Sequence, residues 1–176
     1  MTIPILLDCD PGHDDAIALL LALASPEVEL RGVTTVAGNQ TLEKTTANAV
    51  RVLELVGRED VEAAAGADRP LVREPFVAAY VHGETGLDGS ELPPAKGEPI
   101  AQHAVDFLAE RVGGITLVAT GPLTNVALLL ARHPEGRPAR SRRRASARSR
   151  PSQPRARWTR YSPHDDPNPP RLRPGP

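Results

Sequence analysis

Four aspartates lie within eight residues near the start of the chain, in the segment LLDCDPGHDDAIALLLALA (6–24). An apolar run precedes them and a longer apolar run follows. Carboxylates this close repel each other unless a positive group lies between them. Carboxylate oxygens are also the ligands that hard divalent cations such as Ca²⁺ and Mg²⁺ prefer. The spacing of Asp8, Asp10, Asp14 and Asp15 therefore predicts a metal site.

Other interpretations of this acidic turn account for less of it. Aspartate caps helix N-termini and opposes the helix dipole, but that explains one or two of the four. An EF-hand needs Glu at its twelfth position, and counting from Asp8 reaches Leu19. A phosphatase of the haloacid-dehalogenase type, with Asp8 as nucleophile, is an alternative because LLDCD resembles its strand followed by Asp-x-Asp. That family expects Thr or Val where Gly12 stands.

The elements around the acidic turn follow from hydrophobic patterning. We expect strands at 3–7, 28–36, 61–65 and 115–119, and helices at 14–24, 41–56, 100–112 and 123–132, with a long loop at 66–98. The helix at 14–24 is apolar almost all round and is expected to be buried. Strands that alternate with helices indicate an α/β fold with a parallel sheet and helices on both faces. Ligands of such sheets bind beyond the carboxyl ends of the strands, where the acidic turn, 36–39 and 120–125 should meet.

At this point the residues resemble a known family. DCDPGHDDAIALLLA is similar to the signature of the calcium-dependent nucleoside hydrolases, the inosine/uridine-preferring N-ribohydrolases. Three further segments resemble the same family: TTVAGNQT (34–41), VHGETGLDG (81–89) and LVATGPLTNVALLL (117–130). The resemblance covers residues 3–134. It implies the N-terminal half of a nucleoside-hydrolase-like α/β fold, hydrolysis of ribonucleosides to ribose and free base, and a Ca²⁺ cofactor.

The resemblance also implies roles for single residues. Asp10 and Asp15 match carboxylate ligands of the Ca²⁺, and Thr120 matches the residue whose backbone carbonyl binds the ion. Asp10 also matches the general base that takes a proton from the attacking water. Asp14 and Asn39 match residues that hydrogen-bond the ribose hydroxyls.

The remaining polar residues near the turn have smaller expected roles. The resemblance places His82 near the leaving base, as a contact or catalytic residue. We expect Asp8 to support the metal ligands without binding the metal. Cys9 should pack in a buried strand, because neighbouring carboxylates disfavour its thiolate. Asn125 is expected to hydrogen-bond backbone near a strand end.

The composition changes abruptly near residue 135. Residues 1–135 carry 20 acidic and 9 basic residues, whereas residues 136–176 carry 12 Arg, 2 Asp and 9 of the 19 prolines. We therefore divide the chain into the N-terminal part of a nucleoside hydrolase domain (1–135) and an Arg/Pro-rich tail (136–176), which is too poor in apolar residues to form a core and is expected to be disordered. Its aperiodic composition is typical of a shifted reading frame. We accordingly expect a truncated or frame-shifted family member whose activity is absent or impaired.

A non-enzymatic fragment that binds through its basic tail is the alternative, since clustered Arg binds phosphates. We do not expect nucleic acid as the partner; a small-molecule nucleoside is expected, and the family resemblance implies a homo-oligomer for the intact enzyme. A single cysteine, no signal-peptide pattern and no apolar run of membrane-spanning length favour a cytoplasmic protein without a membrane partner. The family resemblance implies a role in nucleoside salvage.

Overall fold

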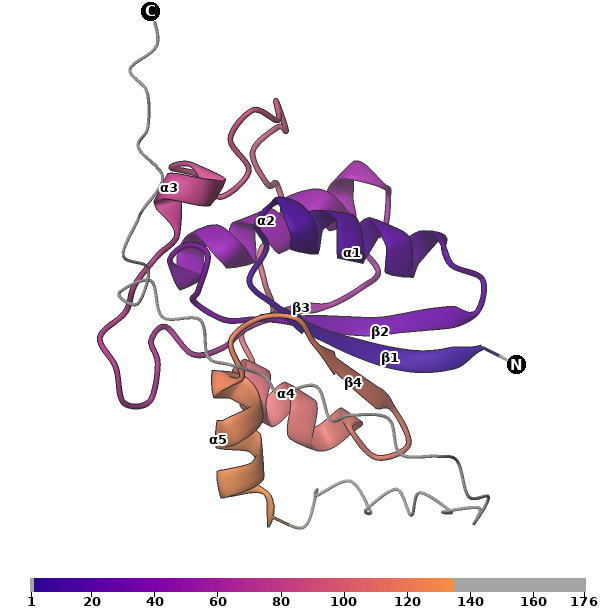
Figure 1. Cartoon of the computed structure of the whole chain (residues 1–176). Helices are drawn as coiled ribbons and strands as arrows, with labels where there is room; N and C mark the ends of the chain where they lie inside the picture. Colours follow the sequence, from indigo (N-terminus) through magenta and orange to yellow (C-terminus); the bar gives the residue numbers. More distant parts are fainter. Residues whose placement is uncertain (1, 135–176) are drawn as a thin grey trace, which may run out of the picture. The chain divides into compact units, whose positions relative to one another are not determined.

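The computed structural model describes residues 2–134 (Figure 1). Strands and helices alternate through most of this range, as the hydrophobic pattern predicts. The elements are, in chain order, β1 (Ile3–Cys9), α1 (His13–Ala24), β2 (Val28–Thr35), α2 (Leu42–Leu55), β3 (Ala63–Ala65), α3 (Ala79–His82), α4 (Ala104–Arg111), β4 (Thr116–Ala119) and α5 (Thr124–Arg132). The predicted tail at 136–176 lies outside the described residues, as does the boundary at 135.

The four strands form one parallel sheet in the order β3-β2-β1-β4. β1 lies inside the sheet, and its Asp8 is in register with Thr34 of β2 and with Ala119 of β4. Helices α1 and α2 cover one face, and α4 and α5 cover the other (Figure 1). The predicted α/β class, with a parallel sheet between helices, is therefore confirmed.

Alternate residues of β1 serve the two faces of the sheet. Ile5, Leu7 and Cys9 pack into one core with α1 and α2, whereas Leu6 packs into a second core with α4 and α5. This alternation is the normal consequence of the pleat, which sends successive side chains to opposite sides. Because both faces are covered, the strand is a continuous apolar run up to Leu7. Cys9 is a buried free cysteine, as predicted.

The prediction that helix α1 is buried all round is wrong. Of its residues only Asp15 and Leu19 are buried, while Ile17 and Leu21 are 64% and 65% exposed. A helix that lies on a sheet contacts it along one stripe, and α1 adds a contact with α2 alongside. The other side of α1 is therefore apolar in composition but is not covered by any of the described residues.

Two further differences concern the region before β4. The segment predicted as one loop, 66–98, contains the short helix α3, which ends at His82. The helix predicted from residue 100 begins at Ala104, because His103 caps it: its Nδ1 accepts a hydrogen bond from the backbone N–H of Val105 (3.2 Å). Within residues 2–134 no helix has the length and apolar character needed to cross a membrane.

Candidate active site

Three loops meet at the carboxyl ends of β1, β2 and β4, as the topology predicts. Asn39, after β2, donates from its backbone N–H to Asp10 Oδ2 (2.7 Å) and from Nδ2 to the Asp10 carbonyl (3.0 Å). After β4, the backbone N–H groups of Thr120 and Gly121 both donate to the carbonyl of Asp8 (2.9 and 3.2 Å). Asp10 and Asn39 are 29 positions apart in the sequence, and Asp8 and Thr120 are 112 positions apart. The acidic turn is thus held from both sides by its neighbours in the sheet.

Asp10 and Asp15 form the buried acidic centre of this loop cluster. Both are at most 5% exposed, and Asp15 Oδ2 accepts the backbone N–H of Asp10 (2.8 Å). Burial raises the pKa of Asp10 to about 7; the Asn39 N–H opposes this, while the charges of Asp15 and Asp14 add to it. The raised pKa therefore reflects mainly the burial of the Asp10 carboxylate, with a smaller part from the neighbouring carboxylates. A bound cation would relieve the repulsion between the two carboxylates.

Asp8 is fully buried one strand position before this centre. Its Oδ1 accepts hydrogen bonds from Thr34 Oγ1 (2.6 Å) and Asn125 Nδ2 (2.8 Å), and Oδ2 has no partner within the described part of the chain. Burial raises the pKa of Asp8, and the two hydrogen bonds counteract the rise. A nucleophile must be reached by substrate, so an enclosed Asp8 does not favour the haloacid-dehalogenase alternative.

Asn125 connects the ends of β1 and β2 with the segment after β3, which is more than its sequence pattern indicated. The predicted backbone hydrogen bonds exist: Nδ2 donates to the Thr35 carbonyl and Oδ1 accepts from the Ala67 N–H, both at 2.9 Å. The contact with Asp8 was not predicted. The two residues are 117 positions apart, and neither local pattern contains a signal for the other.

Asp14 and Thr120 are exposed, and Asn39 is half-buried, at the open side of the same cluster. Asp14 and Asp15 are consecutive residues in the first turn of α1. Successive helical side chains diverge by about 100°, which lets Asp15 face the buried centre while Asp14 remains at the surface. The structure therefore brings together the predicted metal-binding and ribose-binding residues, and their roles remain predictions.

His82 lies over the acidic turn although it comes from a distant loop. Its Nδ1 is buried and makes no hydrogen bond with the described residues, and its ring stacks on that of His13 at a centroid distance of 5.7 Å. A Cβ built on Gly12 would lie 2.5 Å from His82 Nδ1 and 3.0 Å from Asn39 Nδ2. Glycine is thus required at this position for the imidazole to approach the turn.

A cavity of about 640 Å³ opens beside the acidic centre. Gly38 and Pro122 are among its lining residues, and most of the lining is apolar, including the exposed ring of Phe76. A Cβ on Gly38 would lie 2.2 Å from Asp10 Oδ2 and 2.8 Å from Pro122 Cγ, so Gly38 separates the cavity from the carboxylate of Asp10. An apolar wall next to buried carboxylates is suited to a ligand with one flat apolar end and one polar end.

The donor set at the turn fits a hard divalent cation in kind, but it is incomplete. Among residues 2–134 no three His, Cys, Asp or Glu side chains gather around one point. Two buried carboxylates, those of Asp10 and Asp15, are adjacent, and a third, that of Asp8, has an oxygen without a partner in this range. Oxygen donors of this type suit Ca²⁺ or Mg²⁺, and Ca²⁺ takes six to eight of them.

Substitution of Gly38 by Ala tests how tightly the Asp10 carboxylate is held. The added Cβ must displace Asp10 Oδ2 or Pro122, so we expect a loss of about 1–3 kcal/mol in the free energy of unfolding, as for other overpacked sites. Gly113→Ala is the matched control, because a Cβ there meets nothing within 4 Å. Urea denaturation of both variants measures the difference. Equal stability of the two variants would show that Asp10 or Pro122 can move aside without a loss in the free energy of unfolding.

Comparisons with known proteins show the family to which this sequence is similar. The family model described as inosine-uridine preferring nucleoside hydrolase matches residues 5–141. The pyrimidine-specific ribonucleoside hydrolases RihA of Photobacterium profundum and Klebsiella pneumoniae are 60% and 57% identical over 139 residues, which is 77% of this chain and 45% of each relative. The chain thus spans a little under half the length of these curated relatives.

Solved structures give the same result for the fold. A plant nucleoside hydrolase superposes with a TM-score of 0.74 at 37% identity, covering 77% of this chain and 45% of that one. A purine-preferring ribonucleoside hydrolase from Gardnerella vaginalis superposes with a TM-score of 0.72 at 34% identity, covering 76% and 45%. The chain therefore belongs to the family of inosine-uridine preferring nucleoside hydrolases.

Proposed function

We propose that the acidic turn belongs to a ribonucleoside hydrolase site, at which water cleaves the N-glycosidic bond to give ribose and a free base. The observation that carries this proposal is the meeting of Asp10, Asp15, Asn39 and Thr120 at one edge of the sheet. Cleavage of this bond builds positive charge on the ribose ring, and buried carboxylates beside the ring favour that charge. The family membership of the chain supports the same reaction.

Asp10, Asp15 and the backbone carbonyl of Thr120 would hold the cofactor, which we propose to be Ca²⁺. When bound, such an ion lowers the pKa of a water molecule and offers a point of attachment for sugar hydroxyls. Asp10 would then accept the proton of the attacking water, because its carboxylate lies at the centre of the acidic turn. Asp8 would stay enclosed and hold the end of β1 in place.

Asp14 and Asn39 would hydrogen-bond the ribose hydroxyls, since both reach the open side of the cluster. Fixing the sugar against the attacking water converts a bimolecular encounter into an oriented one. His82 would contact the leaving base, because its imidazole lies against Gly12 of the acidic turn. The apolar cavity beside Gly38 offers room for a flat base.

Pyrimidine ribonucleosides are the proposed substrates, because the relatives between 55% and 60% identical carry the name pyrimidine-specific ribonucleoside hydrolase. A role in nucleoside salvage and assembly as a homo-oligomer follow from the family resemblance, and both stay predictions. The cytoplasmic location, predicted from the sequence pattern, also stays a prediction. The expectation that the activity of this chain is absent or impaired also stays a prediction.

The test is release of uracil from uridine by the purified chain, with Ca²⁺ present and after its removal by EDTA. Calorimetry measures Ca²⁺ binding in parallel. We expect one Ca²⁺ to bind, and any release of uracil to stop in EDTA and return when Ca²⁺ is added. Inosine serves as the purine control and should react more slowly than uridine. A chain that neither binds Ca²⁺ nor releases a base would contradict the proposal.

A further inference from the structure

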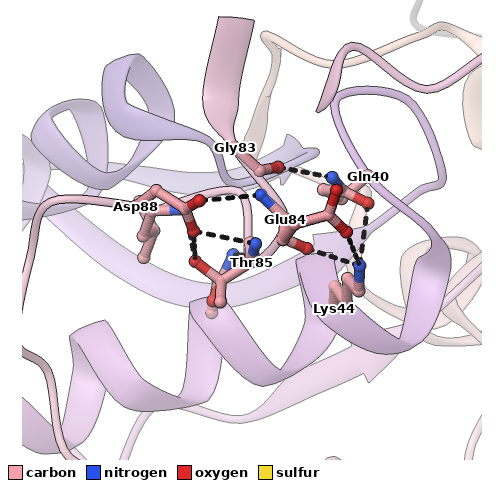
Figure 2. A network of polar contacts seen from close by, with 8 residues as sticks. Gln40, Lys44, Gly83, Glu84, Thr85 and Asp88 are labelled. Atoms are coloured by element: carbon pink, nitrogen blue, oxygen red, sulfur yellow. Dashed lines mark hydrogen bonds and ion pairs between the residues drawn. The ribbon is translucent and has the colours of Figure 1, made fainter. Parts of the chain in front are cut away.

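A row of polar side chains along α2 holds the loop that follows His82. Gln40 lies just before α2, and Lys44 and Asn48 lie four and eight residues further along the chain. Each donates a hydrogen bond to a backbone carbonyl of the loop, and Figure 2 shows the first two of these contacts. The acceptors are three consecutive carbonyls, those of Gly83 (2.7 Å from Gln40 Nε2), Glu84 (from Lys44 Nζ) and Thr85 (2.9 Å from Asn48 Nδ2).

The loop itself is closed by Asp88. Its carboxylate accepts the backbone N–H groups of Glu84 (2.9 Å) and Thr85 (3.0 Å), and the Thr85 hydroxyl as well (2.5 Å) (Figure 2). These hydrogen bonds lower the pKa of Asp88, the one from the Thr85 hydroxyl most. Asp88 thus binds the N–H groups of the turn, whereas the carbonyls of 83–85 accept hydrogen bonds from the polar row on α2. The row on α2 thus docks a preformed turn.

Asn48 also connects this turn to the acidic loop. Its Nδ2 donates to the carbonyl of Pro11 (3.1 Å) as well as to that of Thr85, and the residue is 2% exposed. A Cβ on Gly86 would come within 2.9 Å of the same Nδ2, and Gly86 has φ +87°. One amide therefore sets the distance between the segment that carries Asp10 and the segment that carries His82.

We infer that Gln40, Lys44 and Asn48 are positioning residues for His82, acting through the three carbonyls that follow it. They hold the imidazole against Gly12, where it stacks on His13. His13, in the acidic turn, also binds the loop after His82, because its Nε2 donates a hydrogen bond to the Asp88 carbonyl (2.9 Å). The inference rests on the proposed function, in which His82 contacts the leaving base.

Glu54 provides a matched control on the same helix. Its carboxylate accepts the backbone N–H groups of Lys96 (2.9 Å) and Gly97 (2.6 Å), at the far end of the same long loop. Glu54→Ala therefore loosens this loop without touching the turn after His82. Lys44→Arg is the conservative variant, since it keeps a cationic donor. Lys44 is exposed enough for Lys44→Ala to fold, with its side chain 42% accessible.

The experiment follows the histidine ring signals of the labelled full chain by NMR, together with amide hydrogen exchange. In Lys44→Ala and Asn48→Ala we expect the His82 and His13 signals to shift, and the amides of 83–88 to exchange about two- to tenfold faster, as the loss of one or two hydrogen bonds predicts. The His103 signal should stay unchanged, and Lys44→Arg should restore the wild-type spectrum. Glu54→Ala should leave His82 unchanged and speed exchange at 96–97.

An unchanged His82 signal in Lys44→Ala, or an equal change in Glu54→Ala, would overturn the inference. Titration with uridine and Ca²⁺ adds the link to function. Weaker uridine binding in Lys44→Ala than in Glu54→Ala is expected, with Ca²⁺ affinity the same in both. If uridine does not bind the wild-type chain, the proposed function fails, while the His82 signals still decide whether α2 positions the ring.

Discussion

Asp10→Asn is expected to lower whatever kcat this chain has for base release by about 10²–10⁴-fold, the range that the proposed role as general base would contribute. It should also weaken Ca²⁺ binding, because an amide oxygen is a poorer ligand than a carboxylate. The amide keeps an oxygen that can accept the Asn39 N–H, so the loop should retain its shape. Uracil release and calorimetry measure the two effects.

Although Asp10→Asn should lose activity, the metal-free variant should gain stability relative to the wild type at high pH. In metal-free protein the pKa of Asp10 is raised from 3.8 to about 7, so folding favours its protonated form. The wild type therefore loses stability as pH rises from about 4 through 7, whereas the Asp10→Asn variant lacks this loss. Thermal unfolding in EDTA at pH 8 should show Asp10→Asn as more stable than the wild type.

Asp60→Asn is the control for both measurements. Asp60 lies at the surface and pairs locally with Arg58, so activity, Ca²⁺ affinity and the pH profile should all stay as in the wild type. If Asp10→Asn kept full activity, Asp10 would be neither the base nor an essential ligand. If it destabilised the metal-free protein at high pH, the account of repulsion at the turn would be wrong.

Asn125→Asp should cost about 3–5 kcal/mol in the free energy of unfolding, the range for a buried charge left without its partner. The change removes the donors to Asp8 Oδ1 and to the Thr35 carbonyl, and it places a second carboxylate beside a buried one. The pKa of Asp8 should rise further, since the Asn125 hydrogen bond now lowers it. Urea denaturation at pH 7 measures the loss.

The double variant Asp8→Asn/Asn125→Asp provides the control. It restores one amide and one carboxylate across the same contact, with the roles exchanged, so it should recover part of the lost stability. Recovery stays partial, because a carboxylate at position 125 cannot donate to the Thr35 carbonyl. A single variant Asn125→Asp as stable as the wild type would contradict this prediction and would show that one of the two carboxyl groups is protonated and donates to the other.

Much of the candidate site could be predicted from the sequence, because its acidic residues are neighbours in the chain. Asp8, Asp10, Asp14 and Asp15 lie on one strand-turn-helix. Parallel strands bring their carboxyl ends to one edge, so the proximity of Asn39 and Thr120 also followed from the order of elements. The family resemblance then suggested a role for each residue.

Other parts of the site could not be predicted, because their partners are distant and their own sequence is ordinary. Lys44 and Asn48 are polar residues on an amphipathic helix, a pattern that usually indicates solvent. Only the docked loop shows that they bind the Glu84 and Thr85 carbonyls. The burial of α1 was also predicted wrongly from its composition, because composition does not show which side of a helix has a packing partner. Leu21 is 65% exposed.

The sequence by itself determined the order of strands and helices, the parallel sheet and the acidic turn, since these depend on local periodicity and on residues close in the chain. The tertiary structure decided which carboxylates of the turn are buried and which lies at the surface, and which helix holds the His82 loop. Those outcomes depend on hydrogen-bond partners between 29 and 117 positions apart. Only the packed fold brings such partners within about 3 Å, the distance at which a hydrogen bond forms.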